Sequence, residues 1–483
     1  MSEPVSTASS FPTHAPNAYL SGALAPTQDE IARSDLPVVG KLPQDLNGMW
    51  VRNGPNPMFP PAPHYHWFDG DGMLHGVRIE DGKASYLNRF VRTSSWKKQQ
   101  QSGRNHSPSY VNARPLEHLQ TLAQGARSGG ADFFNKANTA LVWHHGKLFA
   151  LWEAGSPYEI RPADFETVGP DNFFGARQHA VTAHPKIDPV TGELLFFGNS
   201  LRGNRIRYGI LDRAGRLVHQ TTIPVDRIVM MHDFAITQRY TIFFDFPMLV
   251  RPLMPLVGGA MLRYRADRGA RIGILPRYGA GDQVRWFDVE PGFLFHVLNA
   301  WENDDTVTLY ACRFPGAPGV LNRSSTSRDQ LQLDASMYRW VIDVKSGRVV
   351  EGAVDDRPAE FPRVDDALVG APCRYGYAAS FLSKDAPALV KYDLIANTSQ
   401  RHEFAPSQIA GEGIFVPRPN QVSEDDGYLV SMVHDEADDR SEFVILDCRR
   451  FDNGPVIARI PMPQRVPAGF HGVWLDGRSF SSA

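Results

Sequence analysis

ILDRAGRLV (210–218), VIDVKSGRVV (341–350) and VILDCRRFDNGPVIARI (444–460) share the pattern that decides the fold. In each segment an aliphatic run ends at Asp, a few residues with a Gly follow, and a second aliphatic run begins. Asp caps a tight turn and Gly supplies the positive φ that such turns need, so each segment predicts a β-hairpin. KIDPVTGELLFF (186–197) has the same pattern, and VKYDLIANTSQRHEF (390–404) has a looser version of it.

Further strand-like runs lie between these hairpins. TALVWHHGKLFALWE (139–153) and FLFHVLNAWE (293–302) are examples, and the 41 Gly and 37 Pro are spread over the whole chain. Short runs rich in β-branched and aromatic residues and bounded by turn residues are typical of strands. Helical patterns are few: residues 115–126 and 325–335 have one, and 248–263 is compatible with one or two short helices.

Hairpins repeated along one chain predict an all-β fold, and we expect a seven-bladed β-propeller. A period of roughly 69 residues would divide the chain into seven such units. No change of composition marks a linker, so residues 1–483 are expected to form a single domain, with loops and short helices as a cap over its axis. The Ser-, Thr- and Pro-rich residues 1–17 are expected to be a flexible N-terminus.

Composition excludes several classes of protein. The chain has 483 residues, of which 21% are charged and 42% hydrophobic, so it is too apolar to be disordered. A net charge of −3 argues against a general nucleic-acid binder. The N-terminus lacks the features of a signal peptide, and no stretch has 18 uninterrupted apolar residues. These features predict a cytoplasmic protein, with no obligate protein partner indicated.

The histidines carry the strongest chemical signal. The chain has 16 His but only three scattered Cys, so histidine is the expected ligand of any bound metal. Four histidines lie within apolar, strand-like segments that are far apart in the sequence: His184, His232, His296 and His471. They would converge if each lay on the inner strand of a different blade. Four unrelated core histidines, each bonded to a backbone carbonyl, are the alternative.

Four neutral imidazoles suit Fe(II), Cu or Zn, and the ligand type does not choose between them. A ligating imidazole normally donates its second N–H to a carboxylate or carbonyl. Three glutamates within apolar segments could accept such hydrogen bonds: Glu153, Glu360 and Glu412. The alternative is that they are ordinary surface or turn residues. His144 and His145 precede a Gly-Lys turn and are expected to be exposed. The DGDG at 69–72 is compatible with calcium, but no Glu completes an EF-hand loop.

Taken in order, further motifs resemble the carotenoid cleavage oxygenase family, which also includes lignostilbene dioxygenases and the visual-cycle isomerase of the retinal pigment epithelium. The resemblance covers nearly the full length. Its motifs are LPQDLNGMWVRNGPNP (42–57), HWFDGDGMLH (66–75), NTALVWHHGKLFALWEAG (138–155), TAHPKIDPVTGELLFFG (182–198), MMHDFAIT (230–237), FHVLNAWE (295–302), EFPR (360–363), EGIFVPRP (412–419), EDDGYLVSMVHD (424–435) and GFHGVWL (469–475).

The resemblance implies a seven-bladed propeller with one nonheme Fe(II) per chain on its axis. It assigns the four histidines named above as iron ligands and the three glutamates as the residues that orient three of them. Thr139 corresponds to a residue that crowds an open position of the iron. Phe68, Trp152 and Phe295 correspond to residues that line a substrate tunnel. The candidate substrate contacts are these three aromatic residues and Trp96.

The reaction implied is oxidative cleavage of a conjugated C=C bond by O₂, which gives two carbonyl products without a reducing cosubstrate. Lignostilbene-cleaving members use a Tyr and a Lys to bind the 4-hydroxyl group of a phenolic stilbene, and Trp96 and Trp152 align near those positions. We therefore expect a carotenoid or apocarotenoid substrate. The alternative is a stilbene of the lignostilbene or resveratrol type, for which Tyr86 and Lys136 could serve instead, although a strand tyrosine and a surface lysine are the simpler interpretation.

Residues 243–265 are expected to form an apolar insert at the mouth of the tunnel. FPMLVRPLMPLVGGAMLRYR (246–265) combines large aliphatic residues with arginines, as segments that dip into one leaflet of a membrane do. The expected partners are therefore a small apolar conjugated substrate, O₂ and a membrane contacted peripherally. A buried cap over the propeller is the alternative for this insert. A propeller that only binds or scaffolds is the alternative for the chain as a whole.

Overall fold

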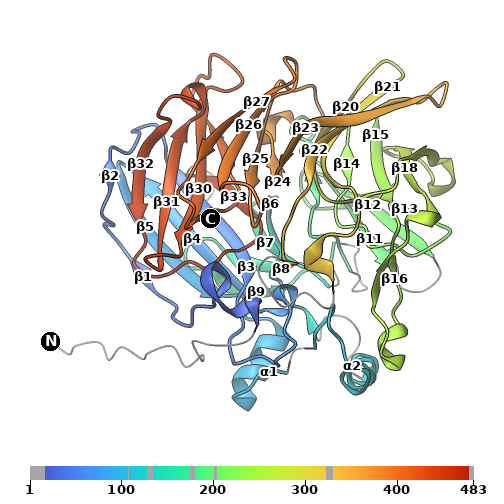
Figure 1. The fold of residues 1–483 in the computed structure, drawn as a ribbon, viewed down its shortest axis with the longest axis horizontal. Coiled ribbons are helices and arrows are strands. Elements are labelled where there is room, and N and C mark those ends of the chain that lie inside the picture. Colours follow the sequence, from blue (N-terminus) through green and yellow to red (C-terminus); the bar gives the residue numbers. More distant parts are fainter. Residues whose placement is uncertain are drawn as a thin grey trace.

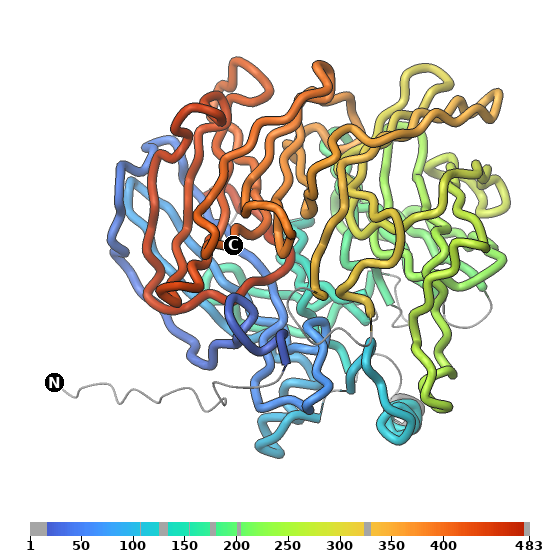
Figure 2. Tube along the Cα trace, viewed as in Figure 1, coloured from blue at the N-terminus to red at the C-terminus, as the bar shows by residue number. Residues whose placement is uncertain are grey.

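The computed structural model describes residues 17–106, 108–127, 134–153, 155–173, 180–200, 204–322 and 330–477. All but the last residue of the expected flexible N-terminus, 1–17, lies outside these ranges. Within them, strands form seven antiparallel sheets that stand side by side as the blades of a propeller (Figures 1 and 2). The predicted all-β, seven-bladed fold is confirmed.

Five blades follow one another along the chain, each with four strands. The first two are β6 (Ala140–His144), β7 (Lys147–Leu151), β8 (Tyr158–Arg161) and β9 (Glu166–Pro170), then β10 (Lys186–Ile187), β11 (Leu194–Ser200), β12 (Arg205–Leu211) and β13 (Leu217–Pro224). The third has β14 (Ala235–Ile236), β15 (Tyr240–Asp245), β18 (Ala270–Pro276) and β19 (Arg285–Val289). The last two are β20 (Phe293–Asn303), β21 (Thr306–Phe314), β22 (Ser336–Asp343) and β23 (Val349–Pro358), then β24 (Glu360–Arg363), β25 (Tyr375–Ser380), β26 (Ala388–Asp393) and β27 (Thr398–Glu403).

The two remaining blades close the ring, because each contains strands from both ends of the chain. One has the order β1 (Ala32–Arg33), β5 (Lys83–Phe90), β4 (Gly72–Glu80), β3 (Gly48–Pro55) and β33 (Gly472–Asp476). The other has β2 (Val39–Gly40), β32 (Val456–Pro461), β31 (Arg440–Asp447) and β30 (Gly427–Asp435), with β28 (Gln408–Ala410) and β29 (Ile414–Pro417) both paired to β30. The C-terminal β33 is thus the innermost strand of one blade, and the N-terminal β2 is the outermost strand of its neighbour.

The hairpins read from the sequence are confirmed, and their glycines have the conformation that the turns require. Gly192, Gly215 and Gly347 have φ of 73°, 78° and 82° in the turns after β10, β12 and β22. In the looser repeat, the turn between β26 and β27 has Asn397 at φ 55° instead. The repeat therefore marks hairpins inside individual blades.

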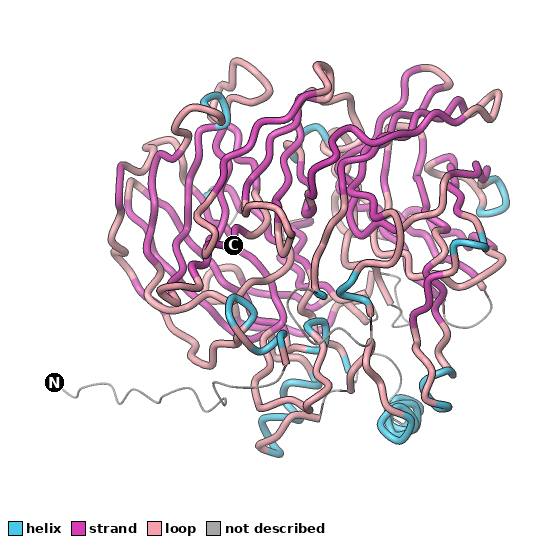
Figure 3. The backbone as a smooth tube through the Cα atoms, viewed as in Figure 1, coloured by secondary structure: helices cyan, strands magenta, loops and turns pink. Residues whose placement is uncertain are grey.

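The two α-helices of the described residues lie on one side of the sheets and form the cap, together with loops (Figures 1 and 3). They are α1 (Ser94–Ser102) and α2 (Pro115–Arg127), and α2 confirms the helical pattern of 115–126. The helix over 325–335 was wrong in its described part, because 331–335 is not helical; residues 323–329 lie outside the described ranges. Within the described ranges, no helix has the length and apolar character needed to cross a membrane.

The expected apolar insert is shorter than predicted and is not mainly helical. β16 (Met248–Val250) and β17 (Leu262–Tyr264) form a two-stranded hairpin, and only Met254–Val257 at its tip forms a 3₁₀ turn, η5. Residues 243–245 belong instead to β15 and are buried in a blade. The two aliphatic runs pair because prolines and paired glycines between them break a longer helix and favour a turn.

The DGDG segment is an internal structural element. The Asp69 carboxylate accepts hydrogen bonds from the backbone N–H groups of His66 and Tyr110 at 2.9 and 3.0 Å, and Asp71 is paired with buried Lys136 at 3.0 Å. Gly72 lies so close to the backbone of residues 136–137 that a Cβ there would stand 2.3 Å from the Ala137 carbonyl oxygen. Both carboxylates serve groups of the chain, and the glycine allows this close approach.

We therefore expect Gly72→Ala to lower the free energy of unfolding by about 1–3 kcal/mol, because the neighbouring backbone must move to admit the methyl group. Denaturant unfolding followed by tryptophan fluorescence measures this effect. Gly316→Ala is the matched control: nothing lies within 4 Å of its added Cβ, so its effect should stay within about 0.5 kcal/mol. Equal stability of the two variants would contradict the steric argument.

Candidate metal centre

The four histidines come from four different blades, at or near the start of an innermost strand. His184 stands two residues before β10, His232 three residues before β14, and His471 directly before β33. His296 is the fourth residue of β20. Because the innermost strands of a propeller all border its axis, residues far apart in the sequence meet there. One ligand atom from each imidazole lies within 4.8 Å of the others.

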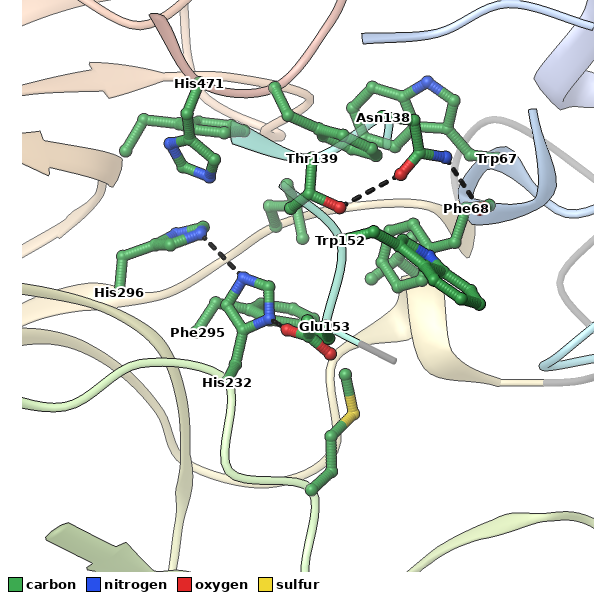
Figure 4. Close-up of a pocket in the computed structure, with 15 residues that line it drawn as sticks. Trp67, Phe68, Asn138, Thr139, Trp152, Glu153, His232, Phe295, His296 and His471 are labelled. Atoms are coloured by element: carbon green, nitrogen blue, oxygen red, sulfur yellow. Dashed lines mark hydrogen bonds and ion pairs between the residues drawn. The ribbon is translucent and has the colours of Figure 1, made fainter. Parts of the chain in front are cut away.

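The imidazoles turn their Nε2 atoms toward a common centre. The Nε2 of His232 lies 2.9 Å from that of His184 and 3.2 Å from that of His296. Figure 4 shows His232, His296 and His471 converging from separate elements. The structure thus brings together all four histidines that stand in strand-like text, which excludes the alternative of four unrelated core residues.

Each of three imidazoles meets a glutamate through its other ring nitrogen. The Nδ1 of His471 donates to Glu412 at 2.9 Å, and the Nδ1 of His296 donates to Glu360 at 2.5 Å. The Nδ1 of His232 contacts the carboxylate of Glu153. These contacts fix the ring orientation and leave Nε2 free to point inward. Among the described residues, no carboxylate contacts His184.

Burial controls the charges of these groups. Together with the neighbouring imidazoles, it lowers the pKa of His184, His232 and His296 well below the ordinary histidine value, so all three are neutral. Burial also raises the pKa of Glu360 to about 8. Burial would raise the pKa of Glu412 as well, but Arg363, together with hydrogen bonds from His471 and Gly472, holds it below the ordinary value.

Neutral nitrogen lone pairs that face one another across about 3 Å suit a bound cation. Without one, the nitrogens would gain little from this arrangement, whereas a metal ion gives each of them an electrostatic partner. The donor set of four imidazole nitrogens, three of them with a carboxylate behind, therefore fits a transition metal. Its softness suits Fe(II), Co(II) or Zn(II) better than Mg²⁺ or Ca²⁺, which prefer oxygen ligands.

An apolar cavity of about 80 Å³ reaches this cluster (Figure 4). Its wall contains Phe68, Thr139, Trp152 and Phe295, which the sequence had placed near the metal or the substrate, and Glu153 as well. Sequence reasoning missed the other members of the wall: Trp67, Asn138, Met230, Val320, Leu333, Phe361 and Phe470. The Thr139 hydroxyl donates to the Asn138 side chain at 3.0 Å, and Asn138 in turn donates to the carbonyl of Phe68 at 3.0 Å.

Trp96, the other expected substrate contact, is not among the residues that line this cavity. It lies in the first turn of α1, where its ring packs near Phe90 and under the guanidinium of Arg92, 4.7 Å from the ring centre. A tryptophan on the inner face of a short helix is buried against the nearest blade. The position of Trp96 next to FVRT in the sequence does not show which face of the helix packs against the blade.

Two further expectations about polar residues were wrong. Lys136 is fully buried and donates to Asp71 and to the hydroxyl of Ser95, so it is not a surface lysine. His144 is buried and bonded to the carbonyl of Gly192, so it is not exposed. Tyr86 is a buried strand residue as expected, and its hydroxyl contacts His75 at 2.7 Å. Neither Lys136 nor Tyr86 lines the cavity.

An exposed apolar patch projects from the cap, and only part of it was predicted. Leu253 and Val257 at the tip of the β16–β17 hairpin are 68% and 77% exposed. Leu116, Leu119 and Leu122 on one face of α2 are also exposed. The His118 side chain of α2 bonds to the carbonyl of Pro252 at 2.6 Å and holds the two elements together. We call these five aliphatic residues the projecting patch.

Comparisons with known proteins agree with this geometry. The family described as retinal pigment epithelial membrane protein matches residues 24–476. This chain belongs to that family, the carotenoid cleavage oxygenases. A carotenoid 9,10(9′,10′)-cleavage dioxygenase 1 of Phaseolus vulgaris is 36% identical over 97% of this chain and 90% of its own length. The resemblance read from the sequence motifs is confirmed.

Solved structures of family members share the fold over almost the whole chain. A lignostilbene dioxygenase of Pseudomonas brassicacearum has a TM-score of 0.85 and 31% identity, and the match covers 97% of this chain and 99% of the other. A cobalt-substituted apocarotenoid oxygenase of Synechocystis has a TM-score of 0.82 and 32% identity, with 93% and 97% covered. The presence of cobalt in this relative is consistent with a metal site at the histidine cluster of this chain.

We expect His232→Ala to lose bound metal, because the nitrogen that faces the centre is removed. Glu360→Gln should keep a larger fraction, since His296 stays in place and only its orientation weakens, which typically costs about 10- to 100-fold in metal affinity. Metal analysis after anaerobic Fe(II) reconstitution and gel filtration measures both. His402→Ala, which lies outside the cluster, is the control and should bind as wild type does. Equal losses in the His232 and Glu360 variants would contradict the assignment.

Proposed function

We propose that this protein is an oxygenase that cleaves a conjugated C=C bond of a carotenoid or apocarotenoid with O₂. His184, His232, His296 and His471 would hold one Fe(II) per chain, with Glu153, Glu360 and Glu412 orienting three of them. The observation that carries the proposal is an aromatic, apolar cavity that reaches the cluster of four imidazoles, three of which line its wall. The family membership supports it.

The reaction balances without a further reductant. The alkene loses its C=C bond, each of its two carbons gains one oxygen atom from O₂, and two aldehydes leave. Bound Fe(II) would supply the one-electron chemistry that allows O₂ to react with an electron-rich double bond. A bound cofactor thus carries the redox step, and the protein has to position the double bond and exclude water.

The residues of the cavity can perform this positioning. Phe68 and Phe295 stand nearly perpendicular with ring centres 6.4 Å apart, and Phe68 and Phe470 are 5.7 Å apart. Such rings offer flat apolar faces to a planar polyene. Thr139 is placed beside the cluster by its backbone, since its N–H bonds to Leu151 and its carbonyl accepts from His471. We infer that Thr139 limits which part of the polyene approaches the centre.

The wall also indicates the class of substrate. Apart from the cluster histidines and Glu153, which contacts His232, the residues that line the cavity are uncharged. No Tyr or Lys among the described wall residues could bind or deprotonate a phenol, because Lys136 and Tyr86 are bonded elsewhere. A long apolar polyene therefore fits better than a hydroxystilbene.

A stilbene dioxygenase remains the second candidate function. It is favoured by the likeness to the lignostilbene dioxygenase of Pseudomonas brassicacearum. Both functions would use the same metal centre. The choice between a carotenoid and a stilbene substrate therefore depends on the side chains of the cavity wall and not on the metal ligands.

We expect the Fe(II)-loaded protein to convert an apocarotenal to shorter aldehydes with a kcat/KM at least about tenfold above that for hydroxystilbenes, because the wall leaves a phenolic hydroxyl without a partner. Liquid chromatography of parallel reactions measures the products. A His296→Ala variant serves as the blank for spontaneous oxidation. Aldehydes from hydroxystilbenes alone would make the stilbene function the correct one.

We further propose that the projecting patch contacts a membrane, from which the protein takes its lipid-like substrate. α2 and the β16–β17 hairpin, which carry the five exposed aliphatic side chains, both lie on the cap side of the sheets (Figure 1). Burial of each in the acyl region would contribute about 1.5–3 kcal/mol. The hairpin is partly exposed at its tip, which argues against a buried cap.

The double variant Leu119→Asp/Val257→Asp should bind liposomes at least about tenfold more weakly, because two charged groups would enter the acyl region. Co-sedimentation with vesicles measures binding, and turnover of detergent-solubilised substrate should be unchanged. Ile395→Asp is the matched control, since Ile395 is 76% exposed in the turn between β26 and β27, outside the patch. Unchanged liposome binding of the double variant would refute the membrane contact.

A further inference from the structure

A second cavity, of about 330 Å³, also reaches the histidine cluster. Its wall contains His184, His296 and His471, and His184 belongs to this wall but not to that of the aromatic cavity. The rest of the wall comes mainly from the innermost strands β6, β10, β20, β24 and β33 and the residues beside them. We call this second space the axial cavity.

The two cavities lie on opposite sides of the histidines along the propeller axis. On the innermost strands the chain passes from one wall to the other. Phe295 lines the aromatic cavity, His296 lines both, and Val297 lines the axial cavity. The same order holds from Phe470 through His471 to Gly472. Since strands extend along the axis, the ring of histidines separates the two spaces.

The axial cavity is charged where the aromatic cavity is apolar. Its charged side chains other than histidine are Lys186, Asp233, Arg363, Asp366 and Glu412, so carboxylates outnumber cations. Arg363 contacts Asp366 at 3.2 Å and Glu412 at 3.7 Å, and Lys186 pairs with Asp233 at 2.7 Å. Exposure falls from 69% at the Asp366 side chain to 21% at Arg363 and 3% at Glu412. Asp366 therefore stands at the mouth.

We propose that the metal ion enters and leaves through this axial cavity, and that Asp366 attracts cations to its mouth. This inference rests on the proposed function, because it requires the four histidines to hold the ion. Substrate and metal would then reach the same centre from opposite sides, and neither would have to pass the other.

The physical reason is the hydration of the ion. A divalent cation exchanges its water shell for protein ligands step by step, and an apolar passage offers nothing in place of the lost waters. The axial cavity offers carboxylates and room, because about six waters at about 30 Å³ each need roughly 180 Å³. His184 is the ligand that would meet the ion first, because it lines the axial cavity and not the aromatic cavity. In addition, no described carboxylate bonds to its ring.

The test is the rate at which apoprotein takes up Co²⁺, followed by stopped flow with an indicator dye for free Co²⁺. At low ionic strength, Asp366→Lys should slow uptake about three- to tenfold and Asp366→Asn less, because the local attraction of the cation is reversed or removed. The difference should vanish near 1 M salt, where charges are screened within about 3 Å. The final amount of bound Co²⁺ should equal that of wild type.

Asp438→Lys is the matched control, because it makes the same change of net charge at an exposed residue outside the cavity wall. Its uptake rate should match wild type, and equal slowing in both Lys variants would overturn the inference. Unchanged uptake by Asp366→Lys, with one Co²⁺ bound per chain, would overturn the route and leave the metal centre standing. A wild-type apoprotein that binds no Co²⁺ would overturn both the centre and the route.

Discussion

Hydrogen bonds between buried glutamates and imidazoles hold the centre of this propeller together. Each joins two blades: Glu360 at the start of β24 binds His296 of β20, and Glu412 between β28 and β29 binds His471 before β33. A buried carboxylate without a partner costs several kcal/mol, so these groups are stable only where the neighbouring blade supplies the ring nitrogen. Closure of the ring by β33 is therefore a condition for the centre, since it delivers His471.

These carboxylates also affect the charge balance of the centre. Four neutral imidazoles alone leave the charge of a divalent ion uncompensated. The structure places three carboxylates directly behind the rings, where they oppose that charge without occupying a coordination position. The raised pKa of Glu360, caused by burial, shows how much this environment disfavours a negative charge that lacks a cation nearby. The ligand set and the acids behind it thus form one electrostatic unit.

The sequence predicted the features that depend on local chemistry. Asp and Gly determine the turns, so the hairpins and the propeller could be predicted from them. The four convergent residues could be predicted because each is a histidine within an apolar, strand-like segment. Features that depend on how distant segments pack could not be predicted. The inner face of α1 buries Trp96, a salt bridge across the cap buries Lys136, and the leucines of α2 form a patch only because the hairpin stands beside them. Exposure and direction are tertiary properties, and residue type alone did not show them.

The ring of histidines divides the axis into an apolar and a charged half, and the innermost strands explain how. Phe295 and Phe470 each directly precede a cluster histidine, and Phe361 directly follows Glu360, so aromatic rings face one side. Charged residues such as Lys186 and Arg363 come two or three positions after a histidine or glutamate of the centre and face the other side. A few residues of strand therefore change the surroundings from an apolar, aromatic wall to a charged wall. In the apolar half water is excluded beside the centre, and there the selectivity of the proposed cleavage would depend on how the wall positions the double bond.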